Sequence, residues 1–227
     1  MQARQAERRI HADDRASNIA RWVVGLVAIG AFVALGAVVG AVVGAVVGGG
    51  RMTGLDRAVQ AWSLAHQRPP LVQLFHGVTV GGGITAMWVL AVIGAVMMWF
   101  RVRSLRVATI LIAPALTNGL VDSVKRIYAR PRPDGVSMGV DHTYSFPSAH
   151  ATTSAAVCCT LAFVLWREGV IGAPAAWCLA VIPPLLVGGS RLYLNMHWTT
   201  DVVGGWCAGV FIAALMSLLY TIESSRE

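Results

Sequence analysis

The chain has 227 residues, of which 56% are hydrophobic and only 13% are charged, and its formal net charge is +7. A soluble domain of this length rarely carries so little charge, so the composition argues against that class and favours a multi-span membrane protein. The cations lie between apolar runs rather than along one soluble face. They therefore favour anionic lipid headgroups as partners and argue against nucleic acid.

The N-terminal region is predicted to be a polar cytoplasmic tail over residues 1–21, followed by a first apolar run. This run is longer than the core of a cleaved signal peptide, so we interpret it as a retained helix. It contains AVVG three times in tandem, which places four small residues on one stripe: Gly36, Gly40, Gly44 and Gly48. We expect the stripe to pack inside the bundle; the alternative is a homodimer interface.

A short amphipathic helix is predicted over residues 53–67, between the first two spans. Its apolar face consists of Leu55, Val59 and Trp62. Thr53 and Asp56 have the spacing of a capping pair at its start. Such a helix lies on the membrane surface, where it either borders a route for lipid entry or only connects two spans.

Six transmembrane helices are predicted, because uncharged runs of about 20 residues can cross the hydrocarbon core. They cover residues 22–48, 74–99, 104–126, 148–166, 173–190 and 198–220. The third and fourth reach spanning length only if they include polar residues of the adjoining motifs. We therefore expect an all-α integral membrane bundle over residues 22–222, followed by a cytoplasmic C-terminal tail at 223–227.

The orientation follows from the cations of the short loops. Six spans place both termini on one side, together with ten Lys and Arg residues, and leave eight on the other side. Three of those eight are interpreted below as substrate ligands, which leaves ten against five. This asymmetry predicts cytoplasmic termini and an active site on the outer face of the cell membrane.

The first polar motif, at residues 125–133, ends the third span. Its prolines predict a helix that stops near Tyr128 and an extended turn beyond it. This turn would fold Arg132 back towards Lys125, and Pro133 would stiffen the arginine. The pair would supply two cations to a shared anion.

Other charged residues near this motif receive structural interpretations. We expect Arg126 and Arg130 to face solvent or lipid headgroups. Asp122 is placed to pair with a cation one helical turn further on. Asp141 and His142 belong to the following outer loop, and we do not expect either to contact a substrate.

The second motif, at residues 147–150, opens the fourth span. Pro147 makes the approach rigid, and Ser148 is a natural N-cap for a helix that begins at Ala149. The free N–H groups of this helix start form an anion site, to which the Ser148 hydroxyl adds a donor. His150 is then positioned to donate a proton to a departing alkoxide or phosphate.

The third motif spans residues 190–201. His197 and Asp201 are four residues apart at the start of an apolar helix, so both project from one helical face. The carboxylate can accept a hydrogen bond from imidazole Nδ1 and leave Nε2 as a nucleophile. Taken alone, an ordinary His–Asp pair is an equally acceptable interpretation. Ser190 ends the preceding helix beside Arg191, whose guanidinium can bind two phosphoryl oxygens.

The predicted topology places all three motifs on the same membrane face. Three cations and a helix N-terminus can neutralise the equatorial oxygens of a transferring phosphoryl group. This set does not require magnesium, and the chain shows no carboxylate cluster suited to a metal. We therefore expect no metal and no other cofactor.

The combined motifs resemble the type 2 phosphatidic acid phosphatase superfamily, which also includes bacterial polyprenyl-pyrophosphate phosphatases. The resemblance implies that His197 forms a phosphohistidine, that Asp201 orients it, and that His150 protonates the leaving group and then activates water. It further implies a set of phosphate-binding residues: Lys125, Arg132, Ser148 and Arg191. Ala149 stands where the family often has glycine, but its N–H remains available.

The resulting hypothesis is a membrane phosphatase that hydrolyses a lipid phosphomonoester or pyrophosphate at the outer leaflet. The substrate classes implied by the resemblance are polyprenyl pyrophosphate, phosphatidic acid and phosphatidylglycerophosphate. A phosphotransferase that passes the group to another lipid or sugar is an alternative within enzymes. A non-catalytic lipid-binding or transport protein is the alternative from another class, and the presence of both histidines and all three cations argues against it.

Overall fold

The computed structural model describes residues 53–133 and 144–224, together with six helical residues of the first predicted span, which are Gly25, Leu26, Ile29, Gly30, Val33 and Ala37. The four glycines of the stripe (Gly36, Gly40, Gly44 and Gly48), the N-terminal tail, and the loop that contains Asp141 and His142 lie outside the described residues. So do residues 225–227 of the predicted C-terminal tail, whereas its first two residues belong to the last helix. Every regular element in the described part of the chain is helical.

Five helical segments of the described residues are long and apolar enough to cross a membrane. They are α4 (Ile84–Val102), the short η1 (Leu105–Ala108) with α5 (Thr109–Tyr128), α6 (Ala149–Arg167), α7 (Ala173–Tyr193) and α8 (Thr199–Ser224). The last four correspond within a few residues to the third to sixth predicted spans. The chain is thus a multi-pass membrane protein, and a count of six spans is not established by the described residues.

The predicted second span at residues 74–99 is wrong in its bounds, because the structure divides this segment into two helices. α3 (Pro69–Gly81) ends at a glycine pair, and α4 begins after it. Gly82 lies against α7, where an added Cβ would be 2.0 Å from a methyl carbon of Val187. The chain therefore turns where only glycine allows such a close approach.

The predicted amphipathic helix is present as α2 (Gly54–His66). Its start has the predicted capping box: the Thr53 hydroxyl accepts from the Asp56 N–H at 3.1 Å, and the Asp56 carboxylate accepts from the Thr53 N–H at 3.0 Å. The Ser63 hydroxyl donates to the carbonyl of Tyr193 at 2.8 Å, and the Tyr193 hydroxyl donates to a carbonyl at the end of α2. These bonds hold α2 against the end of α7.

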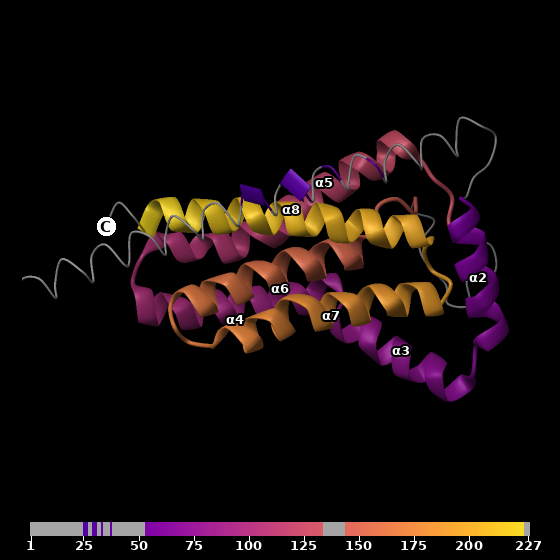
Figure 1. The fold of residues 1–227 in the computed structure, drawn as a ribbon, viewed down its shortest axis with the longest axis horizontal. Coiled ribbons are helices and arrows are strands. Elements are labelled where there is room, and N and C mark those ends of the chain that lie inside the picture. Colours follow the sequence, from indigo (N-terminus) through magenta and orange to yellow (C-terminus); the bar gives the residue numbers. More distant parts are fainter. Residues whose placement is uncertain are drawn as a thin grey trace, which may run out of the picture.

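Two polar residues of α2 face inward, and two of its large apolar residues face outward. Asp56 and Ser63 are buried, whereas Leu55 and Trp62 remain more than half exposed. A soluble protein would show the reverse pattern, so this helix suits a position beside lipid. Figure 1 shows α2 lying across the end of the bundle where α7 ends and α8 begins.

Helix α6 is the centre of the bundle and packs against α4, α5, α7 and α8. Its contact with α8 is very close, because Gly205 and Gly209 face it. A Cβ at Gly209 would lie 2.4 Å from the carbonyl oxygen of Thr152, and one at Gly205 would lie 2.9 Å from that of Ser148. The first turns of α6 and α8, which carry the second and third motifs, are thereby fixed side by side.

Candidate active site

The three motifs meet at one end of the bundle. The C-terminal ends of α5 and α7 and the N-terminal ends of α6 and α8 lie there, with α2 across them (Figure 1). The backbone N–H of Ser148 donates to the carbonyl of Asp201 at 3.0 Å, which joins the second motif to the third. The guanidinium of Arg132 lies 3.1 Å from Nε2 of His197, which joins the first motif to the third.

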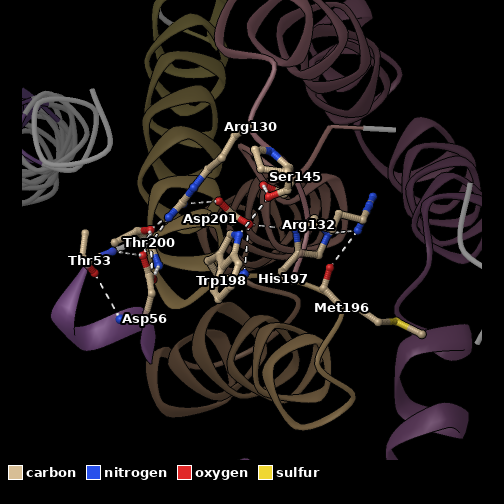
Figure 2. A network of polar contacts seen from close by, with 11 residues as sticks. Thr53, Asp56, Arg130, Arg132, Ser145, Met196, His197, Trp198, Thr200 and Asp201 are labelled. Atoms are coloured by element: carbon tan, nitrogen blue, oxygen red, sulfur yellow. Dashed lines mark hydrogen bonds and ion pairs between the residues drawn. The ribbon is translucent and has the colours of Figure 1, made fainter. Parts of the chain in front are cut away.

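His197 and Asp201 form the contact expected from their spacing. Nδ1 of the imidazole lies 3.3 Å from Oδ2 of the carboxylate, and both side chains are buried. On the other side of the ring, Nε2 faces the guanidinium of Arg132. An arginine can only donate, so Nε2 must accept and Nδ1 must carry the proton that is donated to Asp201. In this tautomer Nε2 is unprotonated, and its lone pair accepts from Arg132. Figure 2 shows the side chains of His197 and Asp201 next to each other.

The environment of the His197 imidazole disfavours its protonation. Burial lowers its pKa well below 6.5, and the cations of Arg132, Arg191 and Lys125 lower the pKa further. A neutral imidazole is therefore the resting form at physiological pH, as nucleophilic attack requires.

The helix start of α6 presents a free hydroxyl rather than a side-chain cap. Ser148 occupies the N-cap position, but its side chain makes no capping hydrogen bond. Its buried Oγ has no hydrogen-bond partner among the described residues. Ser148 thus occupies the predicted N-cap position, but without a side-chain capping bond. Its hydroxyl and the first N–H groups of α6 therefore remain available to an anion.

The remaining cations act on the His197 imidazole. Arg191 is buried, donates from one terminal nitrogen to the Thr79 hydroxyl at 2.9 Å, and has no partner for its buried Nε among the described residues. Arg132 also donates to the carbonyl of Met196 at 2.8 Å, which directs its guanidinium across the site. Lys125 and His150 lie near enough to this group to interact electrostatically with Arg132 and Arg191.

The predicted supporting residues are structural. Ser190 is buried, and its hydroxyl donates to the carbonyl of Val187 at 2.6 Å within α7. Pro147 is buried directly before the N-cap of α6, and Pro133 is buried after Arg132. Ala149 is the first residue of α6, where its N–H belongs to the free helix start. Arg126 is exposed, as expected.

The prediction for Arg130 is wrong, because this arginine is buried behind the histidine. It is only 1% exposed, and its two terminal nitrogens reach two different carboxylates. One donates to Asp201 at 2.6 Å and the other to Asp56 at 2.7 Å (Figure 2). One signal in the sequence was available: alternate residues of an extended turn face the same side, so Arg130 points inward with Arg132.

Asp56 is the second charged residue that the sequence did not assign to the site. It was expected only to cap α2, yet its carboxylate also accepts from the N–H of Thr200 at 2.9 Å. Burial acts to raise the pKa of Asp56, but the N–H groups of Thr200 and Thr53 and the guanidinium of Arg130 together bring the pKa below 3.8. Asp56 is thus a buried, charged member of the site.

Comparison with known proteins gives a consistent family. The model of the PAP2 superfamily matches residues 103–224. Phosphatidylglycerophosphatase B of Bacillus subtilis is 28% identical over 166 residues, which cover 71% of this chain and 81% of the relative. Decaprenylphosphoryl-5-phosphoribose phosphatase of Mycobacterium tuberculosis is 29% identical over 154 residues, which cover 66% of this chain and 80% of the relative.

A solved structure has the same fold. The crystal structure of a transmembrane PAP2-type phosphatidylglycerolphosphate phosphatase from Bacillus subtilis superposes with a TM-score of 0.73 at 24% sequence identity. The superposition covers 83% of this chain and 93% of that one. The helical arrangement described above is therefore that of a known membrane protein architecture.

Proposed function

Because this chain belongs to the PAP2 superfamily, whose matched relatives are lipid and polyprenyl phosphate phosphatases, we propose that it hydrolyses a lipid phosphomonoester or pyrophosphate through a phosphohistidine. Its class is that of a lipid phosphate phosphatase. One observation carries the proposal: the Ser148 Oγ and Arg191 Nε are buried without partners among the described residues. The backbone of Ser148 is bonded to that of Asp201, and the cation of Arg191 acts on the His197 imidazole. Unpaired buried donors are costly, and a phosphoryl group would satisfy them.

In the first step, Nε2 of His197 attacks phosphorus while the bond to the leaving oxygen breaks. The Nδ1–H bond to Asp201 stabilises the positive charge that develops on the imidazole. His150 donates its proton to the leaving oxygen, so that a lipid alcohol or lipid phosphate departs neutralised. The equatorial oxygens are held by Lys125, Arg132, Ser148, Arg191 and the free N–H groups at Ala149.

In the second step, His150 accepts a proton from a water molecule whose oxygen attacks the phosphorus. The P–N bond to His197 breaks and inorganic phosphate leaves. The same carboxylate and cations serve both steps, since the transition states are alike in charge. Because the phosphoryl charge is neutralised by fixed side chains, we expect turnover to be insensitive to EDTA.

We place this site at the outer face of the cell membrane. The side that holds the termini carries ten Lys and Arg residues, and the opposite side carries eight. Four of those eight belong to the site, namely Lys125, Arg130, Arg132 and Arg191, which leaves four ordinary loop cations. The positive-inside rule then favours cytoplasmic termini more strongly than the uncorrected count does. A site at headgroup depth suits a substrate whose chains remain in the bilayer.

The test is a phosphate-release assay on detergent-purified protein with phosphatidic acid, phosphatidylglycerophosphate and a polyprenyl pyrophosphate. We expect release from at least one of them, complete loss in His197→Gln, and normal activity in the control His76→Gln, whose histidine is exposed on α3. Radiolabelled substrate should give an acid-labile, alkali-stable phosphoprotein. Normal phosphate release by His197→Gln would refute the assignment of His197 as the nucleophile. Product analysis with an added acceptor lipid separates hydrolysis from phosphotransfer.

A further inference from the structure

A carboxylate from the membrane-surface helix α2 reaches the rear of the nucleophile. Oδ2 of Asp56 accepts from the guanidinium of Arg130 at 2.7 Å. Its other oxygen, Oδ1, accepts from the N–H of Thr200 at 2.9 Å, and the Thr200 hydroxyl donates to the same carboxylate. The side chains of Asp56 and Arg130 are completely buried. Figure 2 shows this chain of contacts running from α2 to the first turn of α8.

The guanidinium of Arg130 links that carboxylate to the one that orients the histidine. One terminal nitrogen binds Asp56, and the other binds Oδ1 of Asp201 at 2.6 Å. Because the guanidinium is planar and rigid, holding one nitrogen fixes the direction of the other. The Thr200 hydroxyl accepts from the second nitrogen at 2.7 Å and closes the link on the α8 side.

The orientation of the Asp201 carboxylate depends on its hydrogen bond from Arg130. With Oδ1 held by Arg130, Oδ2 faces the Nδ1 of His197 and the N–H of Trp198, the latter at 2.9 Å. Rotation of the carboxylate would lengthen the contact to Nδ1, which is already 3.3 Å. Two of the contacts that prevent rotation end on Arg130 and Trp198. Both residues are held from outside the third motif, Arg130 by the Asp56 carboxylate and Trp198 by the Pro131 carbonyl.

We propose that Asp56 is a positioning residue for the reaction, which acts through Arg130 to hold Asp201 and hence His197 in the attacking geometry. This inference rests on the proposed function. Asp56 also shares the positive charge of Arg130, so that Asp201 keeps more of its negative charge for the imidazole. Removal of the Asp56 charge would leave Arg130 paired with Asp201 alone, and the cationic phosphohistidine would be less stabilised.

The test uses full-length detergent-purified protein, dioctanoyl phosphatidic acid as the probe, and the variant Asp56→Asn, which keeps the shape and removes the charge. We expect kcat to fall about tenfold, as for a small misplacement of a reacting group, while KM changes less than about twofold. Thr53→Ala is the matched control: it removes the other half of the capping box but does not contact Arg130. Its kcat should stay at the wild-type value.

Two oxyanions separate positioning from a general loosening of the site. Vanadate can accept Nε2 of His197 as a fifth ligand, whereas sulfate can only bind to the surrounding cations, which are Lys125, Arg132 and Arg191. Asp56→Asn should weaken inhibition by vanadate about tenfold and leave inhibition by sulfate unchanged. Equal weakening of both would assign Asp56 a merely structural role. In the double variant with Arg130→Gln, the loss should not exceed that of Arg130→Gln alone, because both changes break one link.

The outcomes also separate this proposal from the function on which it rests. Wild-type activity with an unchanged kcat in Asp56→Asn would overturn the role of Asp56 alone. A wild-type protein that releases no phosphate from any probe would overturn both. If Asp56→Asn does not fold, Arg130→Lys carries the test, because one ammonium keeps the charge but replaces the two terminal nitrogens that join Asp56 to Asp201. A wild-type kcat in Arg130→Lys would then refute the proposal.

Discussion

Helices α6 and α8 lie so close together at Gly209 that a methyl group added there should force them apart. In Gly209→Ala the new methyl carbon would lie 2.4 Å from the Thr152 carbonyl oxygen and 3.0 Å from the backbone nitrogen of Ala156. Ordinary contacts begin at 3.4 Å, so α6 and α8 must separate by about 1 Å at this point. The obstacle is helix backbone, which cannot rotate away as a side chain could.

Separation of α6 and α8 would displace the active-site residues, because the two helices carry different parts of the site. His150 stands on the first turn of α6, whereas Asp201 stands on the first turn of α8. A displacement near 1 Å between reacting groups can lower the rate by about 100-fold, and overpacking of this kind costs about 1–3 kcal/mol of stability.

The assay measures kcat on a lipid phosphate and the thermal midpoint in detergent for Gly209→Ala, with Gly119→Ala as control. Gly119 lies in α5, where an added Cβ would have no atom within 4 Å. The alanine there should therefore leave kcat unchanged and should not lower the thermal midpoint. A Gly209→Ala protein with wild-type kcat and midpoint would show that the helix contact does not set the geometry of the site.

Three further predictions concern charge and protons. Arg130→Gln should lower activity at least 100-fold and destabilise the fold by about 3–5 kcal/mol, because it leaves two buried carboxylates without their cation. The control Arg126→Gln, at an exposed position, should match wild type in kcat and in thermal midpoint. The pKa of His197 is lowered, so its neutral form persists as the pH falls below 6.5. ¹⁵N NMR of histidine-labelled protein, with the His197 signal assigned from His197→Gln, should show a neutral ring at pH 6. A half-protonated ring at that pH would show that burial and the nearby cations do not lower the pKa. His150→Ala should lose turnover of alkyl phosphates but retain part of it on aryl phosphates, whose leaving groups need no proton; equal losses on both would remove the acid role.

The features predicted well from sequence are those fixed by short-range patterns. The capping box of Thr53 and Asp56 depends on a three-residue spacing, and it is present at the start of α2. The end of α5 at Tyr128 follows from the prolines beyond it, which cannot continue a helix. The last two spans follow from apolar length, and the two before them follow once the adjoining motif residues are included. In each case the decisive residues belong to one continuous segment of the chain.

The features that were missed depend on partners far apart in the chain. Arg130 is separated from Asp56 by 74 residues and from Asp201 by 71, and no local spacing reports such a pair. The break at Gly82 depends on the approach of Val187 from another helix. Charge balance was a usable constraint, because a buried carboxylate beside a histidine requires a cation. Only the packed bundle identifies which arginine supplies it.

The position of Asp56 has a practical consequence for how the protein can be divided. The match to the family model begins at residue 103, so a catalytic fragment trimmed to that boundary would retain every motif residue and discard α2. Such a fragment would contain Arg130 with one of its two anions missing and the Asp56-binding N–H of Thr200 exposed. Engineered minimal versions and chimaeras should therefore begin upstream of Thr53, so that they keep the contact between Asp56 and Arg130.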